Sequence, residues 1–101
     1  PATLIKVDPK HPKAPGRRVF SEETSYKMRS LLRLVVTHGT GKKADAVGYR
    51  VGGKTGTAEK PLPGGGYSKT DNITSFAGVF PMDEPRYAMV VMLDAPKATP
   101  E

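Results

Sequence analysis

The sequence contains no cysteine among its 101 residues. That absence excludes disulfide bonds, thiolate catalysis and cysteine-based metal sites. Hydrophobic residues make up only 37% of the chain, while ten prolines and eleven glycines interrupt regular elements. The chain has no initiator methionine, signal peptide or membrane-spanning run, and both of its ends read as cuts in a longer chain. We therefore expect a hydrophobic core that this segment completes only together with residues outside it.

Positive charge exceeds negative charge, with a net charge of +6. Such a balance suits anionic partners such as nucleic acid, acidic lipid or a polyanionic wall. The lysines and arginines are spread along the chain, however, and no motif of a nucleic-acid reader is present. This pattern favours a solvated basic surface and predicts no nucleic-acid partner.

The first half of the chain predicts a lead-in segment and one helix. Residues 1–20 are rich in proline and read as a loop. Ser21 is a suitable N-cap for a helix over 21–38, and two acidic residues in the first turn suit the helix dipole. Gly39 fits a left-handed cap after the last turn. His11 stands without a second ligand at metal-binding spacing, so we interpret it as a surface histidine.

The spacing of apolar residues within this helix predicts which face meets the sheet. The core face is predicted to hold Met28, Leu31, Leu32, Val35 and Val36. The outer face is predicted to hold Lys27, Arg29 and Arg33.

The second half predicts a sheet. A strand is expected over 48–58, followed by a long loop over 59–72 and a hairpin of two strands within 73–94. The last strand lacks apolar–polar alternation, which predicts a central position buried on both faces. The fold class is therefore α+β, with an antiparallel sheet of about three strands and a helix packed against one face.

The stretch 48–58 has the most unusual composition. Glycines are dense in it, at positions 52, 53 and 56, and Lys54 lies among them with Thr55 and Thr57 close by. Glycine in a strand marks the close approach of another backbone or a ligand. Lysine and hydroxyl side chains supply positive charge and hydrogen-bond donors. We interpret this stretch as a binding surface for an anionic group.

Two motifs compete for this stretch. Gly48-x4-Gly53-Lys54-Thr55 satisfies the P-loop pattern, but that motif needs a helix directly after it, and residues 56–61 cannot continue as one. The alternative is the Lys-Thr-Gly motif of penicillin-recognising serine enzymes, which requires a strand. The strand context favours the second motif and a carboxylate, rather than a phosphate, as the anion.

The resemblance extends to four segments in matching order, at residues 18–24, 39–44, 48–58 and 75–81. With them, the chain resembles the C-terminal part of the transpeptidase domain of a class B penicillin-binding protein, most similar to the septal, cell-division type. The fold implied is an incomplete piece of the penicillin-binding-protein and serine β-lactamase-like transpeptidase fold. The activity implied is D,D-transpeptidation of peptidoglycan stem peptides through an acyl-serine intermediate, with acylation by β-lactams.

The resemblance also implies roles for individual residues. Lys54 would assist proton transfer beside a second motif, Ser-x-Asn. The hydroxyls of Thr55 and Thr57 would bind the carboxylate of the stem peptide or β-lactam, and the backbone N–H of Thr57 would complete the oxyanion hole. Gly56 would leave room for the acyl group. Strand alternation places Thr55 and Thr57 on the face opposite Lys54, and the sequence does not explain how the three act together.

The family's nucleophile motif is missing from this chain. No serine is followed by lysine three residues later, and no Ser-x-Asn is present. The resemblance therefore implies that the remaining part of the domain supplies both motifs and that this fragment alone is inactive. A non-catalytic β-lactam or peptide sensor of the same fold stays open as an alternative.

The resemblance further implies a setting for the full-length protein. It would lie at the bacterial inner membrane, facing the periplasm, anchored by an N-terminal helix that this chain lacks. Its partners would be peptidoglycan stem peptides, β-lactams and other division proteins. No cofactor or metal is implied.

Overall fold

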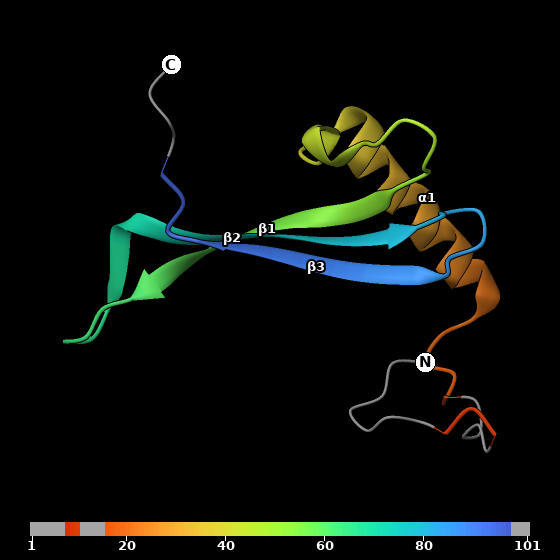
Figure 1. Cartoon of the computed structure of the whole chain (residues 1–101), viewed down its shortest axis with the longest axis horizontal. Coiled ribbons are helices and arrows are strands. Elements are labelled where there is room, and N and C mark those ends of the chain that lie inside the picture. Colours follow the sequence, from red (N-terminus) through yellow and green to blue (C-terminus); the bar gives the residue numbers. More distant parts are fainter. Residues whose placement is uncertain (1–7, 11–15, 98–101) are drawn as a thin grey trace.

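A computed structural model describes residues 8–10 and 16–97 of the chain (Figure 1). The elements run in the order α1 (Glu22–His38), η1 (Lys42–Ala44), β1 (Gly52–Pro61), β2 (Tyr67–Phe80) and β3 (Tyr87–Asp94). The strands form one antiparallel sheet in the order β1-β2-β3, and α1 contacts β1. The predicted α+β class is confirmed. Within 1–20, the described residues form no helix or strand, and His11 lies outside the described part.

Both ends of α1 have a local cause. The hydroxyl of Ser21 accepts a hydrogen bond from the Thr24 N–H at 3.1 Å, as an N-cap does. At the other end, the Gly39 N–H donates to the Val35 carbonyl at 3.0 Å. The predicted left-handed cap is wrong, because Gly39 has an extended backbone with φ of −115°. Glycine is needed here for space, since a Cβ atom would lie 2.9 Å from the Val35 carbonyl oxygen.

The predicted faces of α1 are partly wrong. Val36 is buried as predicted, whereas Met28 and Leu31 are about half exposed. Arg29 and Arg33, predicted to face solvent, are turned inward and donate to backbone carbonyls around the sheet. An arginine can bury its aliphatic stem while its guanidinium finds carbonyl acceptors, so helical spacing of apolar residues alone misassigned these positions.

The predicted loop over 59–72 is wrong, because most of it belongs to β1 and β2. The register of β1 with β2 runs from Gly52 opposite Val79 to Glu59 opposite Asn72, and resumes after an irregularity at Pro61 opposite Tyr67. Only residues 62–66 remain as the connecting loop. Proline is tolerated in β1 because this strand lies at the edge of the sheet, where one side needs no ladder partner.

The strand predicted over 48–58 begins later, at Gly52. Residues ahead of it form a tight turn in which Ala46 bridges Tyr49 and Gly48 has φ of +87°. A backbone with positive φ suits glycine and does not continue a strand. The start of β1 is therefore set by this turn.

The prediction that the last strand is central is also wrong. β2 is central, β3 is at the edge, and all eight residues of β3 are exposed. The apolar run of β3 indicates a buried environment, which β2 alone does not provide. Among the described residues, the buried hydrophobic side chains are few: Val36, Val51 and Met82.

The hairpin of β1 and β2 extends past the end of β3, because β3 pairs with β2 only as far as Ile73 (Figure 1). Lys60 ties this extension to the end of β3 through an ion pair with Asp94 at 2.9 Å. On β2, the buried hydroxyl of Ser68 accepts hydrogen bonds from the N–H groups of Thr70 and Asp71. The ion pair thus attaches the extension to β3, while the Ser68 hydroxyl stabilises the backbone of β2 locally.

The ion pair predicts a pH dependence. The pKa of Lys60 is raised above its ordinary 10.5, first by the hydrogen bond to Asp94, then by its charge, with Asp71 adding to the effect. Because the folded-state pKa is the higher one, the stabilisation is complete below the unfolded-state pKa and is lost as pH rises through the folded-state pKa. In an NMR titration of the Lys60 ammonium, Asp94→Asn should remove most of the upward pKa shift, whereas Asp83→Asn should leave it in place.

Gly53 is the tightest point of the sheet. It pairs with Gly78, and the ring of Phe76 lies over both glycines. A Cβ atom on Gly53 would lie 2.3 Å from the Ala77 carbonyl oxygen and 2.6 Å from the Phe76 ring. Neither the backbone nor the ring can retreat without disturbing the pairing of β1 with β2.

Gly53→Ala should therefore destabilise the fold. Overpacking of this kind costs about 1–3 kcal/mol of unfolding free energy, measurable by urea denaturation of the transpeptidase domain. Gly64→Ala is the matched control, since a Cβ atom there meets nothing within 4 Å. Equal stability of the two variants would contradict the role given to Gly53.

Candidate functional site

All four residues of the predicted site lie on β1, in one unbroken stretch of antiparallel pairing. Opposite Lys54, Thr55, Gly56 and Thr57 on β2 stand, in order, Ala77, Phe76, Ser75 and Thr74. Among the described residues β1 pairs only with β2, so its other edge is open. The stretch is thus presented at an edge of the sheet, where a ligand backbone can approach it.

Lys54 and Thr55 meet although they stand on alternate faces of the strand. The Lys54 ammonium donates to the Thr55 carbonyl at 2.9 Å and to the Thr55 hydroxyl at 3.3 Å. The long lysine side chain therefore bends back along the strand to its neighbour. Lys54 and Thr55 can therefore act together although strand alternation places them on opposite faces, because the ammonium of one reaches the hydroxyl of the other.

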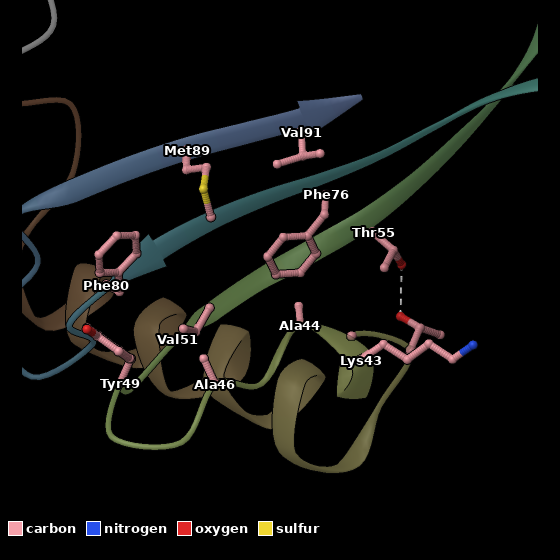
Figure 2. Close-up of a pocket in the computed structure, with 12 residues that line it drawn as sticks. Lys43, Ala44, Ala46, Tyr49, Val51, Thr55, Phe76, Phe80, Met89 and Val91 are labelled. Carbon is pink, nitrogen blue, oxygen red and sulfur yellow. Dashed lines mark hydrogen bonds between the residues drawn. The ribbon is translucent and has the colours of Figure 1, made fainter. Parts of the chain in front are cut away.

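A third residue, Thr40, joins this point. Its hydroxyl lies 2.9 Å from the Thr55 hydroxyl, and the dashed line in Figure 2 marks this hydrogen bond. Thr40 follows the end of α1, in a glycine-rich turn that the sequence favoured as a solvated connector. Sequence reasoning missed Thr40 because only tertiary folding brings the turn to β1. The signal that could have indicated Thr40 is its position between Gly39 and Gly41, in one of the four segments that resemble the family.

The glycines of the stretch have different purposes. A Cβ atom on Gly52 would collide with Met82, and one on Gly53 with Phe76. These two glycines make room for the chain's own atoms, and at Gly53 the close approach is that of the β2 backbone. Gly56 is different: a Cβ atom there would meet only the Ser75 hydroxyl, at 2.8 Å. Thr57 is exposed, and its side chain is accessible to a ligand.

An apolar pocket of about 730 Å³ opens beside Thr55 (Figure 2). Thr40, Lys43 and Thr55 add polar groups to its lining. The apolar part of the lining comprises Val51, Tyr49, Phe76, Phe80, Met89 and Val91. Thr55, a candidate for carboxylate binding, therefore lies between the open edge of β1 and the apolar pocket.

The phosphate-binding alternative is not supported by this geometry. Gly53, Lys54 and Thr55 lie within a strand that continues to Pro61, so no helix N-terminus follows them. Within residues 8–10 and 16–97, no group of three potential metal ligands comes together. In the same ranges, no helix combines the length and the hydrophobicity needed to cross a membrane.

Comparison with known proteins identifies the class. The family described as penicillin binding protein transpeptidase domain matches residues 2–101, and the chain belongs to this family. It is 48% identical over 81 residues to a peptidoglycan D,D-transpeptidase FtsI homolog of Chlorokybus atmophyticus, covering 80% of this chain and 12% of that protein. It is 46% identical over 99 residues to stage V sporulation protein D of Bacillus subtilis, covering 98% of this chain and 15% of that protein.

Solved structures agree with the family. The transpeptidase domain of Burkholderia pseudomallei penicillin-binding protein 3 matches with a TM-score of 0.77 and 42% identity, over 90% of this chain and 27% of that one. Penicillin-binding protein 3 of Mycobacterium tuberculosis, complexed with ampicillin, matches with a TM-score of 0.71 and 37% identity, over 89% of this chain and 23% of that one. The chain thus spans only a small part of each relative. The resemblance found in the sequence is confirmed.

Arg33 of α1 holds the residue directly before the motif strand. Its guanidinium donates to the Val51 carbonyl at 2.7 Å and to the Asp45 carboxylate at 2.9 Å. Only 24% of the Arg33 side chain is exposed, and its bond to the Val51 carbonyl is partly buried, whereas its bond to Asp45 is exposed. Arg33 therefore fixes the place where β1 leaves the preceding turn.

Arg33→Met should loosen this attachment. Loss of a partly buried, charge-assisted hydrogen bond costs about 1.5–3 kcal/mol of unfolding free energy, measurable by urea denaturation of the transpeptidase domain. Lys27→Met is the control, since Lys27 makes a highly exposed ion pair with Glu23 and its loss should cost less than about 1 kcal/mol. An unfolding free energy of Arg33→Met equal to that of the wild type would contradict this role of Arg33.

Proposed function

We propose that this segment forms one wall of the active site of a peptidoglycan D,D-transpeptidase. The reaction is acyl transfer between stem peptides through a serine ester, and β-lactams acylate the same serine. Membership of the penicillin-binding family supports the proposal, as do the relative named a D,D-transpeptidase and the relative solved with ampicillin. The observation that carries it is the convergence of the Lys54 ammonium and the Thr55 hydroxyl at the open edge of β1.

The carboxylate of the stem peptide or β-lactam is bound by hydroxyl groups. Thr55 and Thr57 alternate along β1 and so present their hydroxyls on the same face of the strand. The Lys54 ammonium adds positive charge next to the Thr55 hydroxyl, 3.3 Å away. Hydrogen bonds to a charged group are roughly twice as strong as neutral ones, so this pair attracts an anion selectively.

The acyl group lies along the open edge of β1. Gly56 carries no side chain there, so a substrate backbone can lie against the strand. The Thr57 backbone N–H is one donor of the oxyanion hole, and the N–H of the nucleophilic serine is the other. Lys54 also assists proton transfer at the serine of the Ser-x-Asn motif.

The nucleophile comes from outside this chain, because no serine here has a lysine three residues later. The fragment alone is therefore inactive, and its essential partner is the rest of the transpeptidase domain. We place the full-length protein at the periplasmic face of the inner membrane, in septal wall synthesis with other division proteins. The matched relatives include both an FtsI homolog and a sporulation protein, so labelling of division sites in cells is the test of the septal role.

Lys54→Ala tests the catalytic assignment in the complete transpeptidase domain. Removing the ammonium should lower the second-order rate constant for acylation by a fluorescent penicillin by about 100-fold or more, a common effect of losing a group that assists proton transfer. Lys27→Ala is the matched control, because this lysine is exposed on α1.

Two outcomes would count against the proposal. If Lys54→Ala is labelled by the fluorescent penicillin as fast as the wild type, Lys54 does not assist acylation. Labelling of the wild-type domain without any turnover of stem peptides would instead favour the sensor alternative.

A further inference from the structure

We propose that Thr40 is a positioning residue for ligand binding, which orients the Thr55 hydroxyl so that it donates its proton to the ligand carboxylate. This inference rests on the proposed function, because it takes Thr55 as a carboxylate anchor. It adds a residue outside the Lys-Thr-Gly motif, 14 positions before Lys54 in the chain.

The hydrogen-bond capacity of a hydroxyl group leads to this role. A threonine hydroxyl has one proton to donate and two lone pairs to accept with, whereas a lysine ammonium can only donate. The Lys54 ammonium, 3.3 Å away, therefore occupies one lone pair of the Thr55 oxygen. The Thr40 hydroxyl, 2.9 Å away, can either donate to the second lone pair or accept the Thr55 proton.

A bound carboxylate selects between these two arrangements. A carboxylate only accepts, so it needs the Thr55 proton. When Thr40 donates to Thr55, both lone pairs of the Thr55 oxygen are satisfied and its proton is free to point at the carboxylate. Hydrogen bonds in such a chain polarise one another, so the donor strength of Thr55 toward the anion increases.

The backbone around Thr40 is held in a fixed position. The N–H groups of Gly39 and Gly41 both donate to the Val35 carbonyl, each at 3.0 Å. A Cβ atom would lie 2.9 Å from that carbonyl oxygen at Gly39 and 3.3 Å from it at Gly41. Two glycines bonded to one carbonyl at the end of α1 thus present Thr40 to β1 in a defined place.

Thr40 is poorly placed for a purely structural role. Its side chain is exposed, and its hydroxyl is hydrogen-bonded to the hydroxyl of Thr55. An exposed neutral hydrogen bond adds little to folding stability. The hydroxyl of Thr40 should therefore matter mainly when an anion engages Thr55.

The experiment uses the complete transpeptidase domain and a penicillin that carries its carboxylate. Thr40→Val keeps the branched shape and removes the hydroxyl, Thr40→Ala is a second hydroxyl-free variant, and Thr40→Ser restores the hydroxyl. Thr40→Val should raise the dissociation constant of the initial complex about threefold to tenfold, in the range expected for losing one hydrogen bond. The first-order acylation step and the melting temperature should stay close to wild type, and Thr40→Ser should recover most of the affinity.

A double-mutant cycle with Thr55→Val distinguishes positioning from an independent effect. Thr40→Val should add no further loss of affinity once Thr55 has lost its hydroxyl. The same loss in both backgrounds would overturn the inference, as would wild-type affinity in both hydroxyl-free Thr40 variants. The proposed function fails separately, if Thr55→Val itself binds the penicillin as tightly as wild type does.

Discussion

The pairing of β1 with β2 at Gly53 is the constraint on which the rest of the structure depends. The two strands can approach there only because Gly53 faces Gly78, and the ring of Phe76 fills the space that two missing side chains leave. The same ring lies 3.4 Å from the place of a Cβ atom on Gly41. The Phe76 ring therefore contacts both β1, at Gly53, and the turn that carries Thr40, at Gly41, and so sets their positions.

The last turns of α1 organise the site from the other side. Arg33 bonds to the carbonyl just before β1, while the Val35 carbonyl receives the two N–H groups that flank Thr40. Two residues of one helix thus locate both the beginning of the motif strand and the hydroxyl that meets Thr55. The precision of a catalytic surface depends on such supporting groups, because the reacting side chains inherit their positions from them.

Local signals in the sequence predicted much of this arrangement. Ser21 and the acidic residues after it set the start of α1, and Lys54-Thr55-Gly56 with its strand context indicates the family. The failures involved tertiary structure. Prolines and glycines in 59–72 suggested a loop, but β1 and β2 extend through most of it. The inward turn of Arg33 and the meeting of Thr40 with Thr55 depend on contacts between distant segments, which no local pattern encodes.

The order of the strands has a consequence for folding kinetics. β1 pairs with β2 and β2 pairs with β3, so all pairing is between strands adjacent in the sequence. Only residues 62–66 separate β1 from β2. Closing such a short loop costs little chain entropy and takes far less time than pairing distant segments. The Lys-Thr-Gly strand can therefore acquire its partner early, through contacts that are local in the sequence. In the transpeptidase that we propose, the segment that carries the nucleophile would then dock onto a strand that is already formed.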